Sequence, residues 1–307
     1  MSAARNIQPA TASERRAISR PANDPYAEVV VGGIKTACVS REQMAIVMVE
    51  DCFAARRRTQ APKLIFASNG HAIAKAATDE TFRRQFDAAD LVHADGQPVV
   101  VGARLLTRTP IPERSATTDF VHDAAKAAVA HGLKIFLLGA TEEVNAACAD
   151  ILRFRYPGLQ IVGRRNGYFG RDDEEAVCDA INRSGADIVF VGLSVPLEYD
   201  FCVRNKQRLR AGWLVTCGGC YNFVTGDYRR APDWMQKFSL EWLYRLAREP
   251  RRLFWRYAIT NPLALALIFT RSRSLNSDAA AAAAPPADWQ AQASDAPIAS
   301  LGTRTAH

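Results

Sequence analysis

Short apolar runs alternate with amphipathic segments through most of the chain. The runs at residues 29–31, 64–67, 91–93, 135–138, 161–163, 188–191 and 213–217 have the length and composition of buried strands. Helical periodicity lies between several of them, at residues 41–55, from 141 onward, at 174–182 and at 197–209. Strands separated by helices of this length predict an α/β fold, with a mainly parallel sheet flanked by helices.

Two of these helices have recognisable starts. Ser40 and Gln43 fit a capping box, in which each side chain accepts a hydrogen bond from the other residue's backbone N–H. Thr141 precedes Glu142 and Glu143, and acidic residues in a first turn interact favourably with the helix dipole. The sequence therefore predicts that helices begin next to residues 40 and 141.

The two ends of the chain differ in composition from the middle. Residues 1–27 are polar without an apolar core, and residues 273–307 include an Ala/Pro stretch without periodic apolar positions. Both segments are predicted to be disordered. Between them we expect an α/β domain at residues 28–232 and a basic, aromatic, helical appendage at residues 233–272.

Small and polar residues follow the predicted strands, where ligands bind in open α/β sheets. They are Ser68-Asn69-Gly70, Ala94-Asp95-Gly96, Gly139-Ala140-Thr141, Gly192-Leu193-Ser194 and Gly218-Gly219. We therefore expect a pocket at this edge. Asp95 lies where reacting groups would be placed, and a carboxylate there can act as a general base. Capping the helix from residue 97 is an alternative role for Asp95, and the two are compatible.

Several kinds of nucleotide chemistry lack their motifs. No GxGxxG follows a strand, there is no Walker A lysine motif, and there is no Asp-x-Asp motif to hold a divalent cation. We expect neither a cofactor nor a metal. If a nucleoside diphosphate binds, arginines, backbone amides or helix N-termini must meet its charge.

The segment 241–257, EWLYRLAREPRRLFWRY, mixes arginines with aromatic residues. Pro250 predicts two helices that meet near Glu249. Guanidinium groups in a row suit phosphate, and aromatic residues suit a boundary between water and lipid. A solvated basic helix face is the alternative. The spacing places four of the arginines along one side, Arg245, Arg248, Arg252 and Arg256.

The positive charge is concentrated in this appendage. Residues 234–273 hold eight Lys/Arg and two acidic residues, a net +6, whereas residues 28–233 carry about +1 of the total of +7. This distribution favours a phosphate or anionic-lipid partner for the appendage and speaks against a nucleic-acid-binding protein. The longest apolar stretch, 253–270, contains Arg256, Asn261 and Pro262, so a peripheral segment is expected rather than a span. No secretory signal is recognised in residues 1–25.

Nine motifs, in order, resemble the WecB/TagA/CpsF (WecG/TagA-like) family of bacterial glycosyltransferases. They are ASNG, HADGQPVV, PIPERSATTDF, FLLGA, RYPGLQIVGRRNGYF, GLSVPLE, CGGCYNF, RAPDWMQ and EWLYRLAREPRRLFWRY. The similarity runs from about residue 29 to residue 270. It implies a Rossmann-like α/β body with a C-terminal appendage. It also implies inverting transfer from a UDP-sugar to a polyprenyl-diphosphate-linked saccharide, in bacterial exopolysaccharide or other cell-surface polysaccharide biosynthesis.

The resemblance also assigns roles to individual residues. Asp95 is implied to be the base. The residues implied to bind substrate are Asn69, Thr118, Asp119, Glu198, Gly218, Gly219, Asn222, Arg245, Arg248, Arg251, Arg252 and Arg256. A helix N-cap is the alternative for Thr118 and Asp119, and a solvated first-turn position is the alternative for Glu198.

The chain departs from the family pattern at several positions. Ala67 stands where Thr is common, Glu198-Tyr199 ends a segment that usually reads Pro-Lys-Gln-Glu, and Asn222 replaces an aspartate. The last two bear on which nucleoside or donor is bound. A catalytically silent membrane-associated subunit that binds nucleotide sugars is the alternative function. The expected location is the cytoplasmic face of the bacterial plasma membrane, and the resemblance leaves homo-oligomer formation open.

Overall fold

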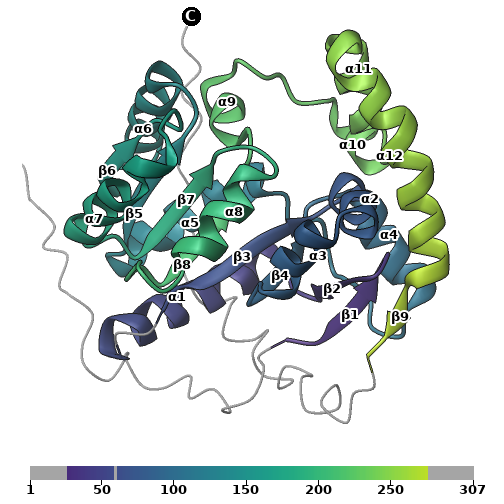
Figure 1. Cartoon of the computed structure of the whole chain (residues 1–307), viewed down its shortest axis with the longest axis horizontal. Helices are drawn as coiled ribbons and strands as arrows, with labels where there is room; N and C mark the ends of the chain where they lie inside the picture. The colour runs from purple at the N-terminus through teal and green to yellow at the C-terminus, as the bar shows by residue number, and fades with distance from the viewer. Residues whose placement is uncertain (1–25, 59–60, 276–307) are drawn as a thin grey trace, which may run out of the picture.

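The computed structural model describes residues 26–58 and 61–275 (Figure 1). Nearly all of the two segments predicted to be disordered therefore lies outside the described residues. The described chain forms a central six-stranded sheet, a small three-stranded sheet and surrounding helices.

All neighbouring strands of the central sheet are parallel, in the order β4-β3-β8-β7-β5-β6. This confirms the predicted α/β fold class. The strands are β3 (Lys63–Ser68), β4 (Leu91–Ala94), β5 (Lys134–Gly139), β6 (Gln160–Arg165), β7 (Ile188–Gly192) and β8 (Trp213–Thr216).

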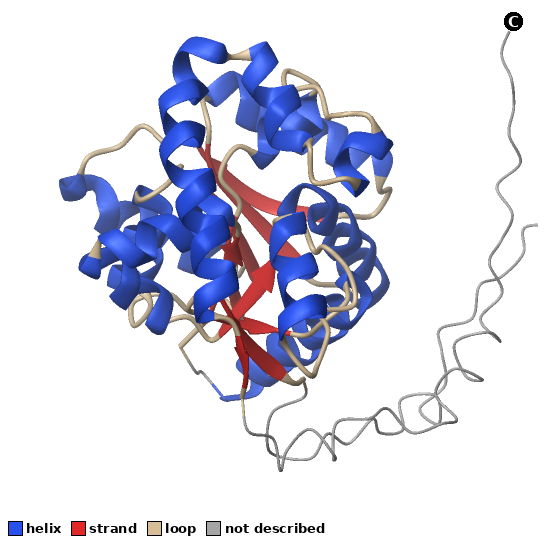
Figure 2. Ribbon diagram, turned by 90° about the vertical axis from the view of Figure 1, so that its right-hand side faces the viewer, coloured by secondary structure: helices blue, strands red, loops and turns tan. Residues whose placement is uncertain are grey.

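Helices cover both faces of the sheet (Figure 2), and alternate strand residues build a core on each face. Phe66, Val189 and Leu214 face α2 (Gly70–Thr78), α3 (Glu80–Asp87), α4 (Gln97–Leu106), α7 (Glu174–Ser184) and α8 (Leu197–Asn205). Ile65 and Phe190 face α1 (Arg41–Arg58), α5 (Thr117–His131), α6 (Glu142–Arg155) and α9 (Cys220–Thr225). A short 3-10 helix, η1 (Arg171–Asp173), precedes α7.

Both predicted helix starts are confirmed. Ser40 N–H donates to Gln43 Oε1 at 2.9 Å, and Gln43 N–H donates to Ser40 Oγ at 3.1 Å. Thr141 caps α6, because its hydroxyl oxygen accepts from Val144 N–H at 3.3 Å. The helix predicted at 197–209 ends earlier, at Asn205.

One predicted strand does not join the parallel sheet. Residues 29–31 belong to β1 (Glu28–Val31), which pairs antiparallel with β2 (Ile34–Ala37) and β9 (Arg273–Ser274). Gly32 and Gly33 have φ of 60° and 87° and form a two-residue hairpin turn that needs positive φ at both positions. A turn of two residues makes the next strand run antiparallel to β1. It therefore excludes a helical crossover to a parallel strand directly after residue 31, which the sequence predicts. β9 also places residues 273 and 274, assigned to the tail by sequence, inside the folded structure.

The appendage consists of α10 (Asp233–Lys237), α11 (Glu241–Arg248) and α12 (Pro250–Arg271). The predicted break at Pro250 is confirmed. In Figure 1, α12 lies along α2 and α4 and leads into β9 beside β1. A Cβ added to Gly102 of α4 would lie 2.6 Å from Ile268, so the two helices approach closely there. Within α12, residues Leu253–Arg271 are long and apolar enough to cross a membrane by length and composition, with 22% of that window buried in the protein.

Candidate active site

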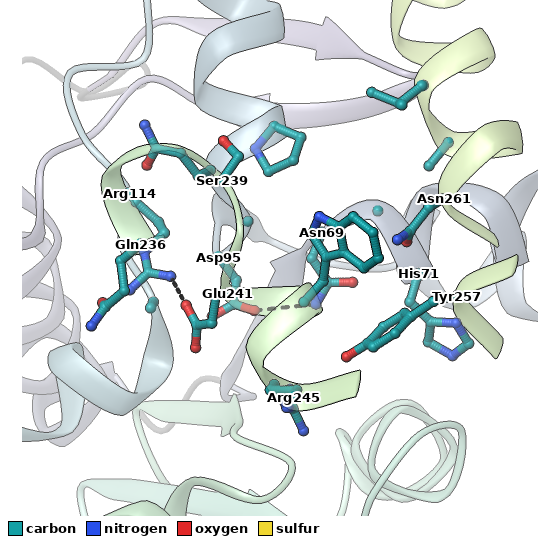
Figure 3. A pocket seen from close by; sticks show the side chains of 18 of the residues that line it. Asn69, His71, Asp95, Arg114, Gln236, Ser239, Glu241, Arg245, Tyr257 and Asn261 are labelled. Carbon is teal, nitrogen blue, oxygen red and sulfur yellow. Dashed lines mark hydrogen bonds and ion pairs between the residues drawn. The ribbon is translucent and has the colours of Figure 1, made fainter. Parts of the chain in front are cut away.

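The carboxyl ends of β3 and β4 border a cavity of about 400 Å³, and the C-terminal helices form its opposite wall (Figure 3). Residues 69–71 and 95–98 line the side of the body, together with the loop before α5. The appendage contributes Glu241, Trp242, Arg245, Arg256 and further residues. A pocket at the strand ends was predicted and is present beside β3 and β4. The residues predicted directly after β5, β7 and β8, namely 139–141, 192–194 and 218–219, do not line this cavity.

Asn69 and Asp95 lie side by side because their strands are in register. Ser68 of β3 pairs with Ala94 of β4, and the two site residues follow directly. Asn69 Oδ1 accepts from Ala72 N–H at 3.1 Å and so caps α2. This leaves Asn69 Nδ2 to donate to Asp95 Oδ2 at 3.1 Å. The helix cap therefore fixes the orientation of the amide that holds the carboxylate.

The second oxygen of Asp95 is held by another helix. Thr117 N–H, at the start of α5, donates to Asp95 Oδ1 at 3.2 Å. Gly96, not Asp95, is the N-cap residue of α4, so the alternative role as a cap for that helix is wrong. Each carboxylate oxygen keeps a further lone pair. Asp95 lines the cavity in a fixed position and can accept a proton from a hydroxyl group there.

A network of ion pairs joins the appendage to the body. Arg114, 14% exposed, forms an ion pair with Glu241 of α11, and its Nη2 lies 3.6 Å from Asp119. It also donates to Gln236 Oε1 at 2.9 Å. Arg230 pairs with Asp119 in turn. Although burial alone would raise the pKa of Asp119, the charges of Arg230 and Arg114 hold it below its ordinary value.

Thr118 and Asp119 do not cap α5, because the helix begins at Thr117 with Ala116 as the N-cap residue. Thr118 lines the cavity, whereas Asp119 belongs to the ion-pair network. The N-cap alternative for both residues is therefore wrong.

The predicted arginines are divided between two helices. Arg245 of α11 and Arg256 of α12 line the cavity. Arg245 and Arg248 also line a second cavity of about 190 Å³, together with Phe223, Tyr228 and Arg229. The guanidinium of Arg245 lies 5.8 Å from the centre of the Phe223 ring. Arg245 and Phe223 thus form a wall shared by both cavities.

The remaining two predicted arginines are Arg251 and Arg252. Arg251 is exposed and lines neither cavity, and the side chain of Arg252 lies outside the described part of the structure. The row predicted from spacing also spans two helices, because α11 ends at Arg248 and α12 begins at Pro250.

Glu198 is buried rather than solvated, with 3% exposed surface. Its Oε2 accepts from Gly218 N–H at 2.9 Å. Burial raises the pKa of Glu198 to about 8, and the charge of Asp95 adds to this effect. Because this pKa lies above neutrality, Glu198 is mainly protonated at pH 7. The solvated alternative is wrong.

Gly218, Gly219 and Asn222 lie beyond β8, outside the larger cavity. Gly218 has φ of 49°, a left-handed conformation that favours glycine, and it presents its N–H to Glu198. Asn222 is in α9, next to Phe223, which lines both cavities. These residues follow the carboxyl end of β8, the strand next to β3, and do not line the cavity that contains Asp95.

Several cavity residues were not among the predicted site residues, notably His71, Arg114, Glu241 and Tyr257. Burial, together with the charges of Arg256 and Lys75, lowers the pKa of His71 to about 4, so its imidazole is neutral at pH 7. The sequence does contain a signal for Glu241. It is one of two acidic residues among eight basic ones in residues 234–273.

Residues with metal-binding or redox chemistry are not gathered at this site. Within residues 26–58 and 61–275, no group of three or more His, Cys, Asp and Glu side chains could hold a metal ion. Cys217 and Cys220 are buried and free, and they lie between the end of β8 and the start of α9.

Comparison with known proteins identifies similar sequences. The family described as the glycosyl transferase WecG/TagA/CpsF family matches residues 29–278. An N-acetylglucosaminyldiphosphoundecaprenol N-acetyl-beta-D-mannosaminyltransferase from Bacillus spizizenii is 28% identical over 200 residues, 65% of this chain and 76% of the relative. A protein of the same name from Staphylococcus aureus is 28% identical over 189 residues, 62% of this chain and 73% of the relative.

Proposed function

Because this chain belongs to the WecG/TagA/CpsF family of glycosyltransferases, we propose that it transfers a sugar from a UDP-sugar to a saccharide carried on polyprenyl diphosphate. The names of the two relatives support an acceptor of this class, since both act on N-acetylglucosaminyldiphosphoundecaprenol. The observation that carries the proposal is the Asp95 carboxylate, held by two N–H donors in a cavity that arginines also line. The pathway is exopolysaccharide or other cell-surface polysaccharide biosynthesis.

The reaction is a single displacement with inversion at the anomeric carbon. Asp95 accepts the proton of the acceptor hydroxyl as its oxygen attacks that carbon. The bond to the nucleoside diphosphate breaks, and the leaving group departs with the bonding electron pair. General-base catalysis of this kind contributes roughly 10²–10⁴-fold to the rate.

Arginines meet the negative charge of the two diphosphates. Arg245 borders both cavities, which supports a role in contacting a donor in one and an acceptor in the other. Arg256 adds a guanidinium on the side of α12. Guanidinium forks bind phosphate oxygens in bidentate geometry and stabilise charge that develops on a leaving group.

The appendage brings the protein to the cytoplasmic face of the plasma membrane. The net charge of +6 on residues 234–273 would be attracted to anionic lipid. Large apolar side chains are exposed on the same helices, among them Trp234, Phe238, Leu243, Phe254 and Trp255. Basic and aromatic residues together suit a peripheral segment that lies in the interface.

The test is transfer from a panel of UDP-hexoses and UDP-N-acetylhexosamines to N-acetylglucosaminyl diphosphate on a short isoprenoid. We expect one donor to be used, with Asp95→Asn reducing turnover by about 10²–10⁴-fold. A chelator should leave the rate unchanged. UDP-sugar binding without transfer would instead support the catalytically silent subunit.

A further inference from the structure

The cavity that contains Asp95 has both polar and apolar lining residues. Asn69, Asp95 and Arg114 are among the polar ones and are labelled in Figure 3. Pro98 of α4 and Ala264, Leu265 and Ile268 of α12 are among the apolar ones. Trp242 and Tyr257 add two rings to the lining, 6.0 Å apart and edge to face. A molecule that filled the cavity would therefore contact charged and apolar side chains together.

Exposed apolar residues of α4 and α12 adjoin the apolar lining residues of the cavity in the sequence of each helix. Helical spacing places Val101 and Leu105 on the same side of α4 as Pro98, and both are exposed. It places Phe269 one turn after Leu265, on the same side of α12. Gly102 and Ile268 hold the two helices together between these rows. We define the apolar strip as Pro98, Val101, Leu105, Leu265 and Phe269.

We propose that the apolar strip binds the first isoprene units of the acceptor's polyprenyl chain. This inference rests on the proposed function and extends it to a site for the lipid part of the substrate. Arg245 and Arg256 line the same cavity as Asp95 and as Pro98 and Leu265 of the strip. A diphosphate bound by them would direct its sugar towards Asp95 and its hydrocarbon chain towards Leu265. The strip is exposed in the protein alone, and burial by hydrocarbon would remove that surface from water.

The strip is distinct from the rest of the exposed apolar surface of the appendage. Ile259 and Phe269 are both on α12 and are 65% and 67% exposed. Only Phe269 follows Leu265 by one turn, whereas Ile259 projects from another side of the helix. The two residues therefore form a matched pair for substitution. Each aspartate would add one negative charge at an equally exposed position.

The experiment measures binding of isoprenyl diphosphates with two, three and four isoprene units in solution, without sugar and without membrane. We expect each added unit to tighten binding by about tenfold, the equivalent of burying roughly two methylene groups. Phe269→Asp should remove most of the gain from the longer chains, and Ile259→Asp should retain it. Leu105→Asp, on the opposite side of the strip, should behave as Phe269→Asp does. Inorganic pyrophosphate should bind equally to all of these proteins.

Three results would overturn the inference. Affinity independent of chain length would show that the chain is not bound. Equal losses in Phe269→Asp and Ile259→Asp would point to general charge repulsion. A parallel loss of pyrophosphate binding in Phe269→Asp would mean that the strip only supports α12. Failure of the proposed function is distinguishable, because it would abolish transfer in the wild-type protein while leaving the dependence of binding on chain length intact.

Discussion

Arg114 and Glu241 form an ion pair between residues 127 positions apart in the sequence. Arg114 precedes α5 in the body, and Glu241 is the first residue of α11. Both also line the cavity that contains Asp95. One of the contacts that join the appendage to the body is therefore part of the wall of this cavity.

Removing either partner should break an ion pair at a partly buried position, although Arg114 keeps Asp119 at 3.6 Å when Glu241 is removed. We expect the Arg114→Ala and Glu241→Ala substitutions to be coupled by about 1 kcal/mol or more in the free energy of unfolding. Chemical denaturation of the two single variants and the double variant measures this coupling. Additive effects would show that the pair does not stabilise the docked appendage.

Asn69→Asp should move the acidic limb of the pH profile of kcat/KM upward by about one to two pH units. The new carboxylate would cap α2 as the amide does, but it would lie next to Asp95. Two carboxylates at this distance cannot both ionise at their ordinary pH, and the base must be ionised to act. Asn69→Ser, which adds no charge, is the control and should move the limb less. An unchanged profile in Asn69→Asp would argue against Asp95 as the base.

Arg245→Gln and Arg256→Gln should each lower kcat/KM by about ten- to a hundredfold, the loss expected for a charge-assisted hydrogen bond. The assay uses a water-soluble, short-chain acceptor, so that membrane binding does not contribute. Arg251→Gln is the matched control, because it removes the same charge from an exposed residue that lines neither cavity. Equal losses in all three variants would indicate an effect of overall charge instead.

Glu198→Gln should change how stability depends on pH. The pKa of Glu198 is about 8 in the folded protein and is taken as near 4.5 in the unfolded chain. The folded state therefore holds a proton that the unfolded state releases, so stability falls as pH rises from about 4.5 to 8. The glutamine side chain does not ionise, so the variant does not lose stability in this way as pH rises. The difference in Tm, variant minus wild type, should therefore increase by roughly 5 °C or more as pH rises from about 4.5 to 8. Parallel curves of Tm against pH would contradict the buried, protonated state.

The sequence predicts the elements whose signals are local. Buried strands are continuous apolar runs, and Asp95 stands directly after one of them, so its place at the edge of the sheet follows from the order of residues. The Ser40–Gln43 capping box and the break at Pro250 are equally local. No bounds are predicted for helices α2 to α5 beyond the start of a helix at residue 97, which is the start of α4.

Other features depend on contacts that no local pattern encodes. Residues 29–31 look like any buried strand, and only the glycine pair after them distinguishes a hairpin from a crossover. Glu198 is in the first turn of a helix, a position usually open to solvent, and its burial arises from packing against the loop at Gly218. The pairing of Glu241 with Arg114 joins two segments that only the complete fold brings together.

The pairing of β1 with β9 has a consequence for the order of synthesis. β1 is made first and can form its hairpin with β2 at once, but its other edge must wait until translation has passed residue 274. Until then α12 lacks the strand that holds its C-terminal end, and Arg256 is not yet held opposite Asp95. The nascent body therefore carries Asp95 without the complete cavity around it. On the proposed function, competence for transfer would appear only after Arg273 and Ser274 have left the ribosome and paired with β1.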